Sequence, residues 1–382
     1  MKLIEYYESA LERLKNDCIQ CGKCVFGCKA MQALPEAPDP RRTQADILDF
    51  LRGGASLSAS ALLKTRACMR CYGCLDLPCP IKVSSLQINE LIARELHRRG
   101  DLPWDGPTYP VHKEKVEKLC SAAERQRITR PVANPDASTL FFPGCNVYKQ
   151  PDKLLNALEV LDAIGEPHSF APGMKYCCGS SPRGMAGDVE WVQGAAGKLF
   201  AYAESLNTKT LVFWCPTCLS MLQDRIRHFY NPPFECLSFG QYVLAHLDRL
   251  KFPAAVPQRV AYHEPCKNAY MGIDPDSVRQ ILRAIPGTQL LEMEHHGKDT
   301  LCYGCTAVDS HPETGEKATL RRLLEAKACG ADTLITMCHN CNWIFTPALK
   351  ARGKAHGLTF SIENLSTYLT KAMGIARPDS LL

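Results

Sequence analysis

Apolar side chains in the first hundred residues recur at intervals of three and four positions. Residues 1–15 show this spacing among charged neighbours, with apolar side chains at Leu3, Ile4, Tyr7, Leu11 and Leu14. Side chains at this interval lie on one face of a helix, so the segment is predicted to be an amphipathic helix. The same spacing predicts further helices over residues 45–51, 59–65 and 86–98. The N-terminal part of the chain is therefore expected to be helical.

Short β-rich runs that end on cysteines replace this pattern beyond residue 137. Two of them, residues 140–142 and 211–214, lead into Cys145 and Cys215. Helical stretches fill the intervals between such runs, at 153–164, 191–206 and 320–328. This alternation of strand, cysteine and helix predicts α/β lobes with parallel sheets, in which sites form at the carboxyl ends of the strands.

The second part of the chain also contains an internal repeat. Residues 210–218 match residues 333–341 at an offset of 123, and Cys145 corresponds to Cys266 at an offset of 121. Two copies of one strand–cysteine–helix pattern predict two similar lobes that face each other about an approximate two-fold axis.

The predicted domain organisation follows from these patterns. Pro103, Pro107 and Pro110 mark the end of the helical part, and the charged stretch 112–130 predicts a connecting helix. We therefore expect an α+β multidomain protein in which an α-helical domain precedes two pseudo-symmetric α/β lobes. The expected boundaries are 1–110 for the helical domain, 111–136 for the linker helix, and 137–252 and 253–382 for the lobes.

Composition excludes several classes of protein. The 382 residues suggest two or three domains, and a net charge of +5 favours neither nucleic-acid binding nor a polybasic membrane arm. No stretch reaches the ~18 apolar residues of a membrane span, and the chain starts without a secretory signal. The 21 cysteines are therefore expected in a reducing cytoplasm, where many thiols indicate bound metal.

The N-terminal cysteines form two runs of ferredoxin type. The first has the spacing C-x2-C-x2-C-x3-C, and the second nearly repeats it with one extra residue before its last cysteine. Three such cysteines wrap around one face of a [4Fe–4S] cubane, and the fourth ligand usually comes from the other run. The expected ligand sets are Cys18, Cys21, Cys24 and Cys79 for the first cluster, and Cys68, Cys71, Cys74 and Cys28 for the second. A zinc ribbon needs only two CxxC pairs and would leave four cysteines unused.

Five further cysteines converge from three segments in the first lobe. They are Cys145, the adjacent pair Cys177 and Cys178, and Cys215 and Cys218. Zinc takes four ligands, so five thiolates exceed what one tetrahedral metal needs. The surplus of sulfur favours an iron–sulfur cluster.

Two ferredoxin runs followed by two cysteine-rich "CCG" repeats resemble the iron–sulfur subunits of the heterodisulfide reductase family. Relatives include subunits of anaerobic glycerol-3-phosphate dehydrogenase, glycolate oxidase, lactate-utilisation enzymes, and electron-bifurcating and benzoyl-CoA reductase complexes of anaerobic metabolism. The resemblance covers residues from about 17 to 341. It implies that each CCG repeat binds a noncubane [4Fe–4S] cluster, and that a substrate disulfide is cleaved between the two clusters. It assigns the complete five-cysteine set of the first lobe to such a cluster.

The second lobe departs from this family pattern. The resemblance assigns its site to Cys266, Cys302, Cys338 and Cys341, but Tyr303 stands where the doubled cysteine should continue. A tyrosine cannot bridge two irons as a thiolate does. Four cysteines suffice for an ordinary cubane, whereas Cys305 could substitute and keep a five-thiolate cage. Cleavage of a disulfide by two equivalent clusters is therefore not the favoured function.

The favoured function is an iron–sulfur electron-transfer subunit of a cytoplasmic, heterodisulfide reductase-like oxidoreductase complex. The sequence contains neither a GxGxxG fingerprint nor a P-loop, so a flavin or nicotinamide would belong to a partner subunit. One alternative is a disulfide reductase that acts on a disulfide or thiol substrate. Another is the iron–sulfur partner of a flavin hydroxy-acid or glycerol-3-phosphate dehydrogenase that passes electrons towards quinone. A metal-binding scaffold without redox function is the remaining alternative, and bound zinc would favour it.

Overall fold

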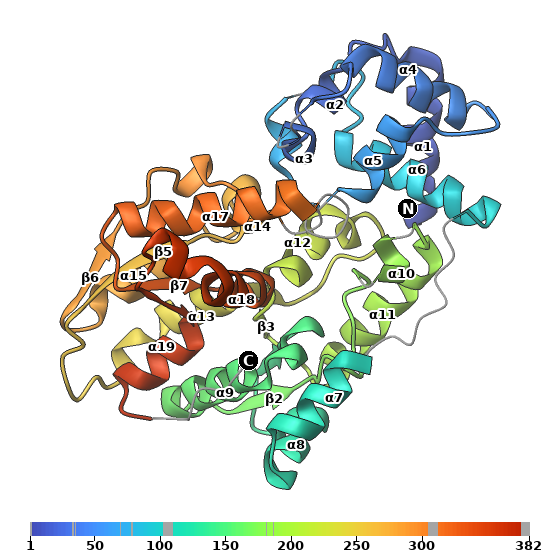
Figure 1. The fold of residues 1–382 in the computed structure, drawn as a ribbon. Coiled ribbons are helices and arrows are strands. Elements are labelled where there is room, and N and C mark those ends of the chain that lie inside the picture. The colour runs from blue at the N-terminus through green and yellow to red at the C-terminus, as the bar shows by residue number, and fades with distance from the viewer. Residues whose placement is uncertain are drawn as a thin grey trace.

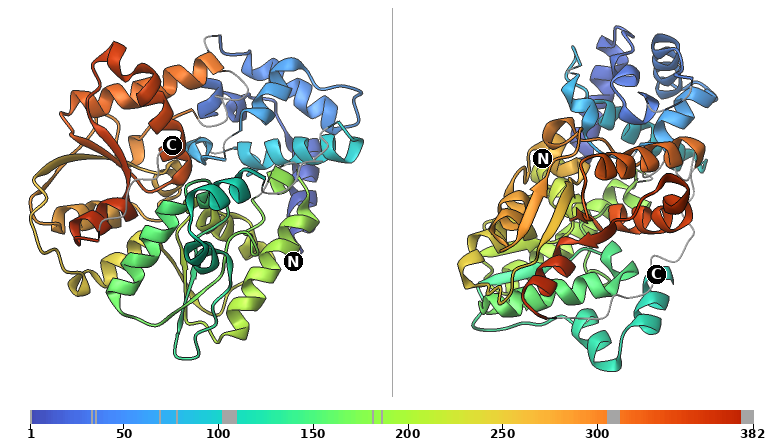
Figure 2. Two further views of the ribbon diagram at one scale, coloured as in Figure 1. Left: turned by 60° about the horizontal axis from the view of Figure 1, so that its bottom comes forward. Right: turned by 60° about the vertical axis from the view of Figure 1, so that its left-hand side comes forward.

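The computed structural model describes residues 2–32, 34, 36–68, 70–77, 79–101, 110–180, 182–185, 187–304 and 312–375. Within these ranges the protein combines many helices with two separate four-stranded parallel sheets (Figure 1). The N-terminal helices lie at one end of the molecule, and the two sheets lie at the other (Figures 1 and 2). The expected mixture of helix and parallel sheet is therefore confirmed. In the described part of the chain, every helix is too short or too polar to span a bilayer.

The N-terminal part is helical, as its apolar spacing predicts. It contains α1 (Leu3–Asp17), α2 (Lys23–Phe26), α3 (Lys29–Gln32), α4 (Pro40–Leu51), α5 (Ala59–Arg66), the short η1 (Gly73–Asp76) and α6 (Ser85–Arg99). The four helices expected from the sequence correspond to α1, α4, α5 and α6. Helix α1 buries one apolar face, consisting of Leu3, Tyr7, Ala10 and Leu14. Helix α6 starts at Ser84, whose hydroxyl accepts a hydrogen bond from the Gln87 amide.

The connection to the sheets consists of two helices, α7 (Pro110–Leu119) and α8 (Ala122–Thr129). The prediction of one continuous helix over residues 112–130 is therefore wrong. The chain breaks at Ser121, whose side chain caps α8, while the Glu124 carboxylate accepts a hydrogen bond from the Ser121 amide at 2.8 Å. This capping box starts a new helix where charge pattern alone shows no interruption.

The first sheet has the strand order β2-β1-β3-β4, with all strands parallel. Its strands are β1 (Thr139–Phe142), β2 (His168–Phe170), β3 (Thr210–Phe213) and β4 (Glu235–Ser238). Its helical elements are η2 (Asn146–Lys149), α9 (Pro151–Ile164), α10 (Pro182–Met185), α11 (Val189–Ser205), α12 (Pro216–Asp224), η3 (Ile226–His228), α13 (Phe239–Ala245) and η4 (Leu247–Arg249). The central strand β1 is fully buried, which fits its continuous apolar sequence.

The second sheet repeats this order as β6-β5-β7-β8, again with all strands parallel. Its strands are β5 (Gln258–His263), β6 (Thr288–Leu291), β7 (Thr333–Thr336) and β8 (Ser361–Asn364). Its helical elements are α14 (Cys266–Met271), α15 (Ser277–Ala284), η5 (Gly297–Asp299), α17 (Pro312–Ala328), α18 (His339–His356) and α19 (Leu365–Ala372). The two sheets thus share one connectivity, which agrees with the sequence repeat.

The two sheet-containing parts contact each other through α9 and α19 (Figure 2). The contact includes buried hydrogen bonds: Asn156 Nδ2 donates to Thr367 Oγ1 at 3.1 Å, and Ser366 Oγ donates to the Lys153 carbonyl at 2.9 Å. Because buried polar groups need partners, these bonds fix the relative position of the two parts.

Candidate metal centres

The first N-terminal cysteine set forms where the two ferredoxin runs meet. Burial, together with its thiol neighbours Cys18, Cys79 and Cys21, raises the pKa of the Cys24 thiol to about 11. Gln44 on α4 contacts two members of the set, since its Oε1 lies 2.6 Å from Cys24 Sγ and its Nε2 lies 3.5 Å from Cys18 Sγ. The structure therefore places Cys79, from the second run, beside the cysteines of the first run.

The second N-terminal set likewise includes one cysteine from the other run. Burial raises the pKa of Cys74 to about 12, and the next largest effects come from Cys68 and Cys28. Cys28, from the first run, thus lies beside the second run. Cys71 neighbours Cys74 and Cys68, and after burial the largest effect on its pKa comes from Cys266 in the second sheet-containing part. This set therefore lies at the junction between the N-terminal helices and the second sheet.

The first sheet brings five thiols together at its carboxyl edge. Cys145 follows β1, the adjacent pair follows β2, and the last two lie at the start of α12. A hydrogen bond with Cys177, together with burial, holds the pKa of Cys145 well above its usual range. Cys178 is hydrogen-bonded to both Cys177 and Cys218, and Cys218 is hydrogen-bonded to Cys215. All five predicted cysteines are therefore in one group.

The second sheet groups four thiols in the same way. Cys266 begins α14 and hydrogen-bonds to Cys302, which lowers the pKa of Cys266 to about 7. Cys338 precedes α18 and hydrogen-bonds to Cys341, which lowers the pKa of Cys338 to about 6. Cys305, the alternative ligand, lies outside the described residues.

The residue in place of the missing thiol has a different role. Tyr303 is buried, with its ring centroid 5.7 Å from that of Phe345 and 6.3 Å from that of His263. It belongs to the hydrophobic core of the second sheet. Among the described residues, the second group thus contains four thiols and an aromatic side chain where the first group contains five thiols.

A family model described as CCG, cysteine-rich domain, matches residues 139–223 and 260–346. The two matched segments contain the two cysteine groups at the sheet edges. The chain is heterodisulfide reductase-like, with two CCG domains. We refer to residues 139–223 and 260–346 as the first and second CCG domains.

Curated relatives support this assignment over most of the chain. One subunit of the fumarate reductase (CoM/CoB) of Methanothermobacter marburgensis is 26% identical over 88% of this chain and 68% of its own length. One subunit of the dihydromethanophenazine:CoB–CoM heterodisulfide reductase of Methanosarcina barkeri is 23% identical over 87% of this chain and 89% of its own length. A crystal structure of a hypothetical protein from Helicobacter pylori aligns over 98% of this chain and 76% of its own, with a TM-score of 0.51 and 12% identity. The last similarity concerns the fold alone.

The two CCG domains meet at one histidine. His339 lies between Cys338 and Cys341 of the second domain, and it also lies beside Cys215 of the first domain, whose pKa is lowered mainly by Cys218 and also by His339. Its ring is buried, with its centroid 6.4 Å from that of Trp214. Cys215 in turn raises the pKa of Cys338, although bonding to Cys341 has the larger and opposite effect. The two cysteine groups are therefore neighbours.

The donor sets fit iron–sulfur clusters. Iron binds thiolates, and hydrogen bonds from neighbouring thiols lower the pKa of Cys215, Cys266 and Cys338. Each of these cysteines lies at the first turn of a helix, where the helix dipole also favours negative charge. Gly144 leaves room beside the group, because a Cβ there would lie 2.8 Å from Cys215 Cβ and 3.0 Å from Cys218 Sγ.

Several residues near the cysteines carry no motif that sequence analysis could detect. Lys64 on α5 is fully buried, and its charge lowers the pKa of Cys24, Cys28 and Cys74 against the larger effect of burial. Lys64 therefore lies next to both N-terminal sets. The sequence predicts only that Lys64 lies on a helix, and it does not predict that its side chain is near the cysteines. The remaining cysteines lie apart from these sets: Cys120 follows α7, Cys236 lies on β4 and Cys329 follows α17.

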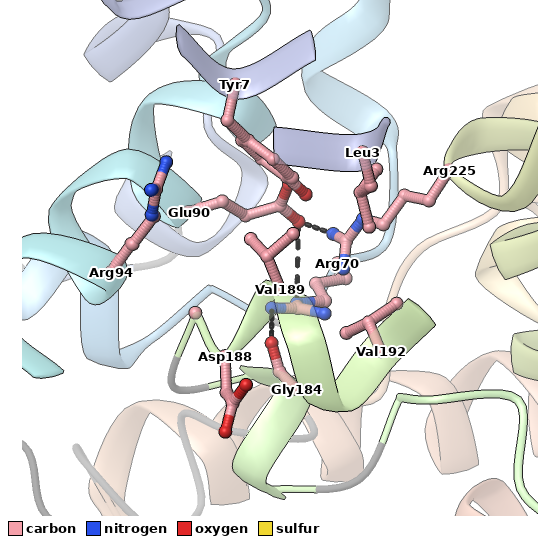
Figure 3. A pocket seen from close by; sticks show the side chains of 11 residues that line it. Leu3, Tyr7, Arg70, Glu90, Arg94, Gly184, Asp188, Val189, Val192 and Arg225 are labelled. Atoms are coloured by element: carbon pink, nitrogen blue, oxygen red, sulfur yellow. Dashed lines mark hydrogen bonds and ion pairs between the residues drawn. The ribbon is translucent and has the colours of Figure 1, made fainter. Parts of the chain in front are cut away.

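A buried charge cluster joins the N-terminal helices to the first CCG domain (Figure 3). Glu90 on α6 pairs with Arg70 at 3.7 Å and with Arg225, and it accepts a hydrogen bond from the Tyr7 hydroxyl at 2.6 Å. Arg70 also donates to the Gly184 carbonyl at 3.2 Å. The cavity beside the cluster measures only about 10 Å³, room for about one water molecule. These contacts hold the N-terminal helices against the first CCG domain.

Proposed function

We propose that this chain is an iron–sulfur electron-transfer subunit of a heterodisulfide reductase-like oxidoreductase complex. Its N-terminal domain would hold two cubane clusters, the first CCG domain a noncubane cluster, and the second CCG domain a further cluster, either a cubane or a modified cluster. The proposal divides the chain into an α-helical ferredoxin domain (1–110), a linker (111–136) and two pseudo-symmetric lobes (137–252 and 253–382). It keeps the reducing cytoplasmic setting that the 21 cysteines favour.

One observation carries this proposal: the four cysteine groups form a continuous row. Buried Lys64 lies next to both N-terminal sets. Cys71 of the second set neighbours Cys266 of the second CCG domain. The second CCG domain in turn meets Cys215 of the first through His339. The row therefore runs from the first N-terminal set, through the second set and the second CCG domain, to the first CCG domain.

Iron–sulfur clusters bound in this row would exchange single electrons. The residues of the chain determine how readily they do so. Burial of Cys178, Cys215 and Cys218 keeps water away from the group in the first CCG domain, and the buried Lys64 ammonium favours negative charge on the two N-terminal sets. The polar ring of His339 lies beside Cys215 of the first CCG domain, and polar groups next to a cluster sulfur tune the reduction potential of the cluster.

The difference between the two CCG domains supports electron transfer over symmetric catalysis. The first domain gathers five thiols, as a noncubane cluster requires in this family. In the second domain Tyr303 packs against Phe345 and His263. The four thiols that remain suffice for a cubane. The two domains are therefore proposed to hold different clusters.

Partner subunits would supply the electrons and consume them. The curated relatives are themselves named as single subunits of reductases. A flavin-containing subunit is the proposed partner, because the sequence lacks a nucleotide-binding fingerprint of its own.

Reduction of a disulfide substrate is a second candidate function, and the contact between the CCG domains favours it. Trp214 Nε1 and Asn342 Nδ2 are buried there without hydrogen-bond partners among the described residues. Buried polar atoms of this kind are usually satisfied by water or a ligand. Cleavage would consume two electrons and two protons and release two thiols. A paramagnetic signal that appears only when a thiol is added to the oxidised protein would distinguish this function from electron transfer alone.

Electron transfer can be tested on anaerobically purified protein. After reaction with a limiting amount of reduced viologen, rapid-freeze EPR should show signals from both the N-terminal and the CCG clusters. The Cys71→Ser variant interrupts the row, and it should slow equilibration between these signals while the first CCG domain keeps its iron. Unchanged equilibration in a variant that has lost its second N-terminal cluster would contradict the proposed route.

A further inference from the structure

A cavity of about 400 Å³ lies where the N-terminal helices meet the second CCG domain. Its walls come from four segments: α3, α14 through Tyr270, the segment that contains Cys302, and one face of α17. Figure 1 labels the three helices. Small-molecule sites typically have volumes of about 300–1,000 Å³, so this cavity is large enough for a ligand. It differs in place from the contact between the two CCG domains.

The wall of the cavity is positively charged. Lys29, Lys317 and Arg321 line it, and none of the described lining residues is acidic. Lys317 and Arg321 are four residues apart on α17, so both side chains leave the same face of that helix. A concave site lined by one sign of charge concentrates ions of the opposite sign.

Two of these cations pair with a carboxylate of α17, but only the partner of Lys317 is exposed enough for an anion to replace it. Lys317 Nζ lies 2.6 Å from Glu313 in a pair whose side chains are 68% and 77% exposed. Arg321 Nε lies 3.4 Å from Glu325, a buried carboxylate that also pairs with Arg322, while the Arg321 side chain itself is 57% exposed. The exposed pair of Lys317 contributes only about 0–1 kcal/mol, and neither carboxylate is among the described residues that line the cavity.

The third cation connects the cavity to the N-terminal clusters. Lys29 follows Cys28, and its ammonium lies 5.9 Å from the centre of the Tyr270 ring. Its aliphatic stem lies against Gly73, where a Cβ would come within 2.7 Å of Lys29 Cγ. The cavity is therefore bounded on one side by residues next to the second N-terminal set, and on the other by Cys302.

We propose that this cavity binds a small molecule carrying an oxyanion group, such as a carboxylate, phosphate or sulfonate, beside the cysteines of the second CCG domain. The anionic group is held by Lys29, Lys317 and Arg321, and the rest of the ligand reaches Cys302. The inference rests on the proposed function only in that Cys302 binds a cluster.

The test titrates the fully iron-loaded chain with inorganic phosphate, inorganic sulfate and oxalate, using calorimetry and EPR. One saturable site should appear for at least one of the three anions, and its occupation should shift the EPR signal of the second CCG domain. Which anion binds distinguishes phosphate, sulfonate and carboxylate ligands. The double variant K317Q/R321Q should weaken binding at least tenfold.

Two further variants separate this site from general attraction to a positive protein. Ala318 lines the cavity between the two cations, so Ala318→Leu should weaken binding by filling space without changing charge. Lys354→Gln removes an exposed charge from α18 that is not among the described residues lining the cavity, and it should leave binding unchanged. Equal weakening by Lys354→Gln, or no saturation up to about 10 mM of any anion, would overturn the proposal.

Failure of this inference can be told apart from failure of the proposed function. Iron content and EPR are measured before the titration. A preparation without iron in the second CCG domain contradicts the proposed function, whatever the anions do. A fully loaded protein that binds none of the anions contradicts only the ligand site, and the three cations would then serve to offset cluster charge.

Discussion

His339 lies beside Cys215 although the two residues belong to different CCG domains. The histidine is held in place by the cysteines of its own domain, since it follows Cys338 at the start of α18. A residue of the second domain therefore lies beside a candidate cluster ligand of the first domain. A change in the position or charge of either cysteine group would therefore alter the surroundings of the other group.

Replacement of this histidine should change the potential of the first CCG domain. Both ring nitrogens of His339 are buried without a hydrogen-bond partner among the described residues, so an N–H of the ring is available to a cluster sulfur beside it. A donor of this kind stabilises the more electron-rich state, so His339→Gln should lower the midpoint potential by about 60 mV, equivalent to a tenfold change in equilibrium. Redox titration followed by EPR measures this shift. His356→Gln removes an exposed histidine at the other end of α18 and should have no effect. The same potential in the His339→Gln variant and in the unchanged protein would contradict this role.

The exchange of ligands between the ferredoxin runs gives a second prediction. Because Cys28 neighbours Cys68 and Cys74, the variants Cys28→Ser and Cys74→Ser should weaken one and the same EPR signal. Cys24→Ser and Cys79→Ser should together affect the other signal, because Cys79 lies beside Cys24.

The loss in each variant should be about four irons per chain, measured by iron analysis beside the EPR spectrum. Cys236→Ser, on β4 and outside all sets, is the control and should keep the full iron content. If Cys28→Ser and Cys24→Ser instead removed the same signal, each run would bind its own cluster and the exchange would be wrong.

The buried charge cluster predicts a large loss of stability from a small change. Glu90→Gln leaves Arg70 and Arg225 without their buried counter-charge, and breaking such a pair costs about 3–5 kcal/mol. Urea unfolding under anaerobic conditions measures the change. Glu95→Gln, on the same helix, breaks pairs with the more exposed Arg98 and Arg99 and should cost less than about 1 kcal/mol. Equal costs for the two variants would show that the cluster does not stabilise the junction.

A pH dependence should arise at the same junction. Burial raises the pKa of Asp224 to about 6, although hydrogen bonding to Tyr72 and the charge of Arg70 oppose the shift. The folded state thus favours the protonated carboxyl. Its contribution to stability is complete below about pH 4 and is lost as the pH rises through about 6.

Between about pH 5 and about pH 7, this loss should amount to about 1 kcal/mol of the unfolding free energy. Asp224→Asn should remove that part of the pH dependence, whereas Asp248→Asn, at an exposed position in η4, should not. Unfolding in urea at several pH values provides the comparison. A slope that survives in the Asp224→Asn variant would assign it to another group.

Local patterns in the sequence predicted most of the secondary structure. Apolar spacing located α1 and α6, and β-rich runs located β1 and β3, because each depends on neighbouring residues alone. The same reasoning missed the break at Ser121, where a capping box interrupts a uniformly charged stretch.

The candidate site was predictable to the extent that cysteine spacing encodes it. The predicted exchange of Cys28 and Cys79 agrees with their placement, while binding of iron by these residues stays a prediction. Contacts between domains cannot be predicted from cysteine spacing. The approach of Cys71 to Cys266 and of His339 to Cys215 depends on how whole domains pack, which no local spacing records.

Iron analysis combined with Mössbauer and EPR spectroscopy of anaerobically prepared protein tests the central claim most directly. Four four-iron clusters predict about sixteen iron atoms per chain, with one spectral component, from the first CCG domain, that differs from a cubane. Iron well below about twelve atoms per chain, or zinc in place of iron, would contradict the assignment of these cysteines to a row of electron-transfer centres.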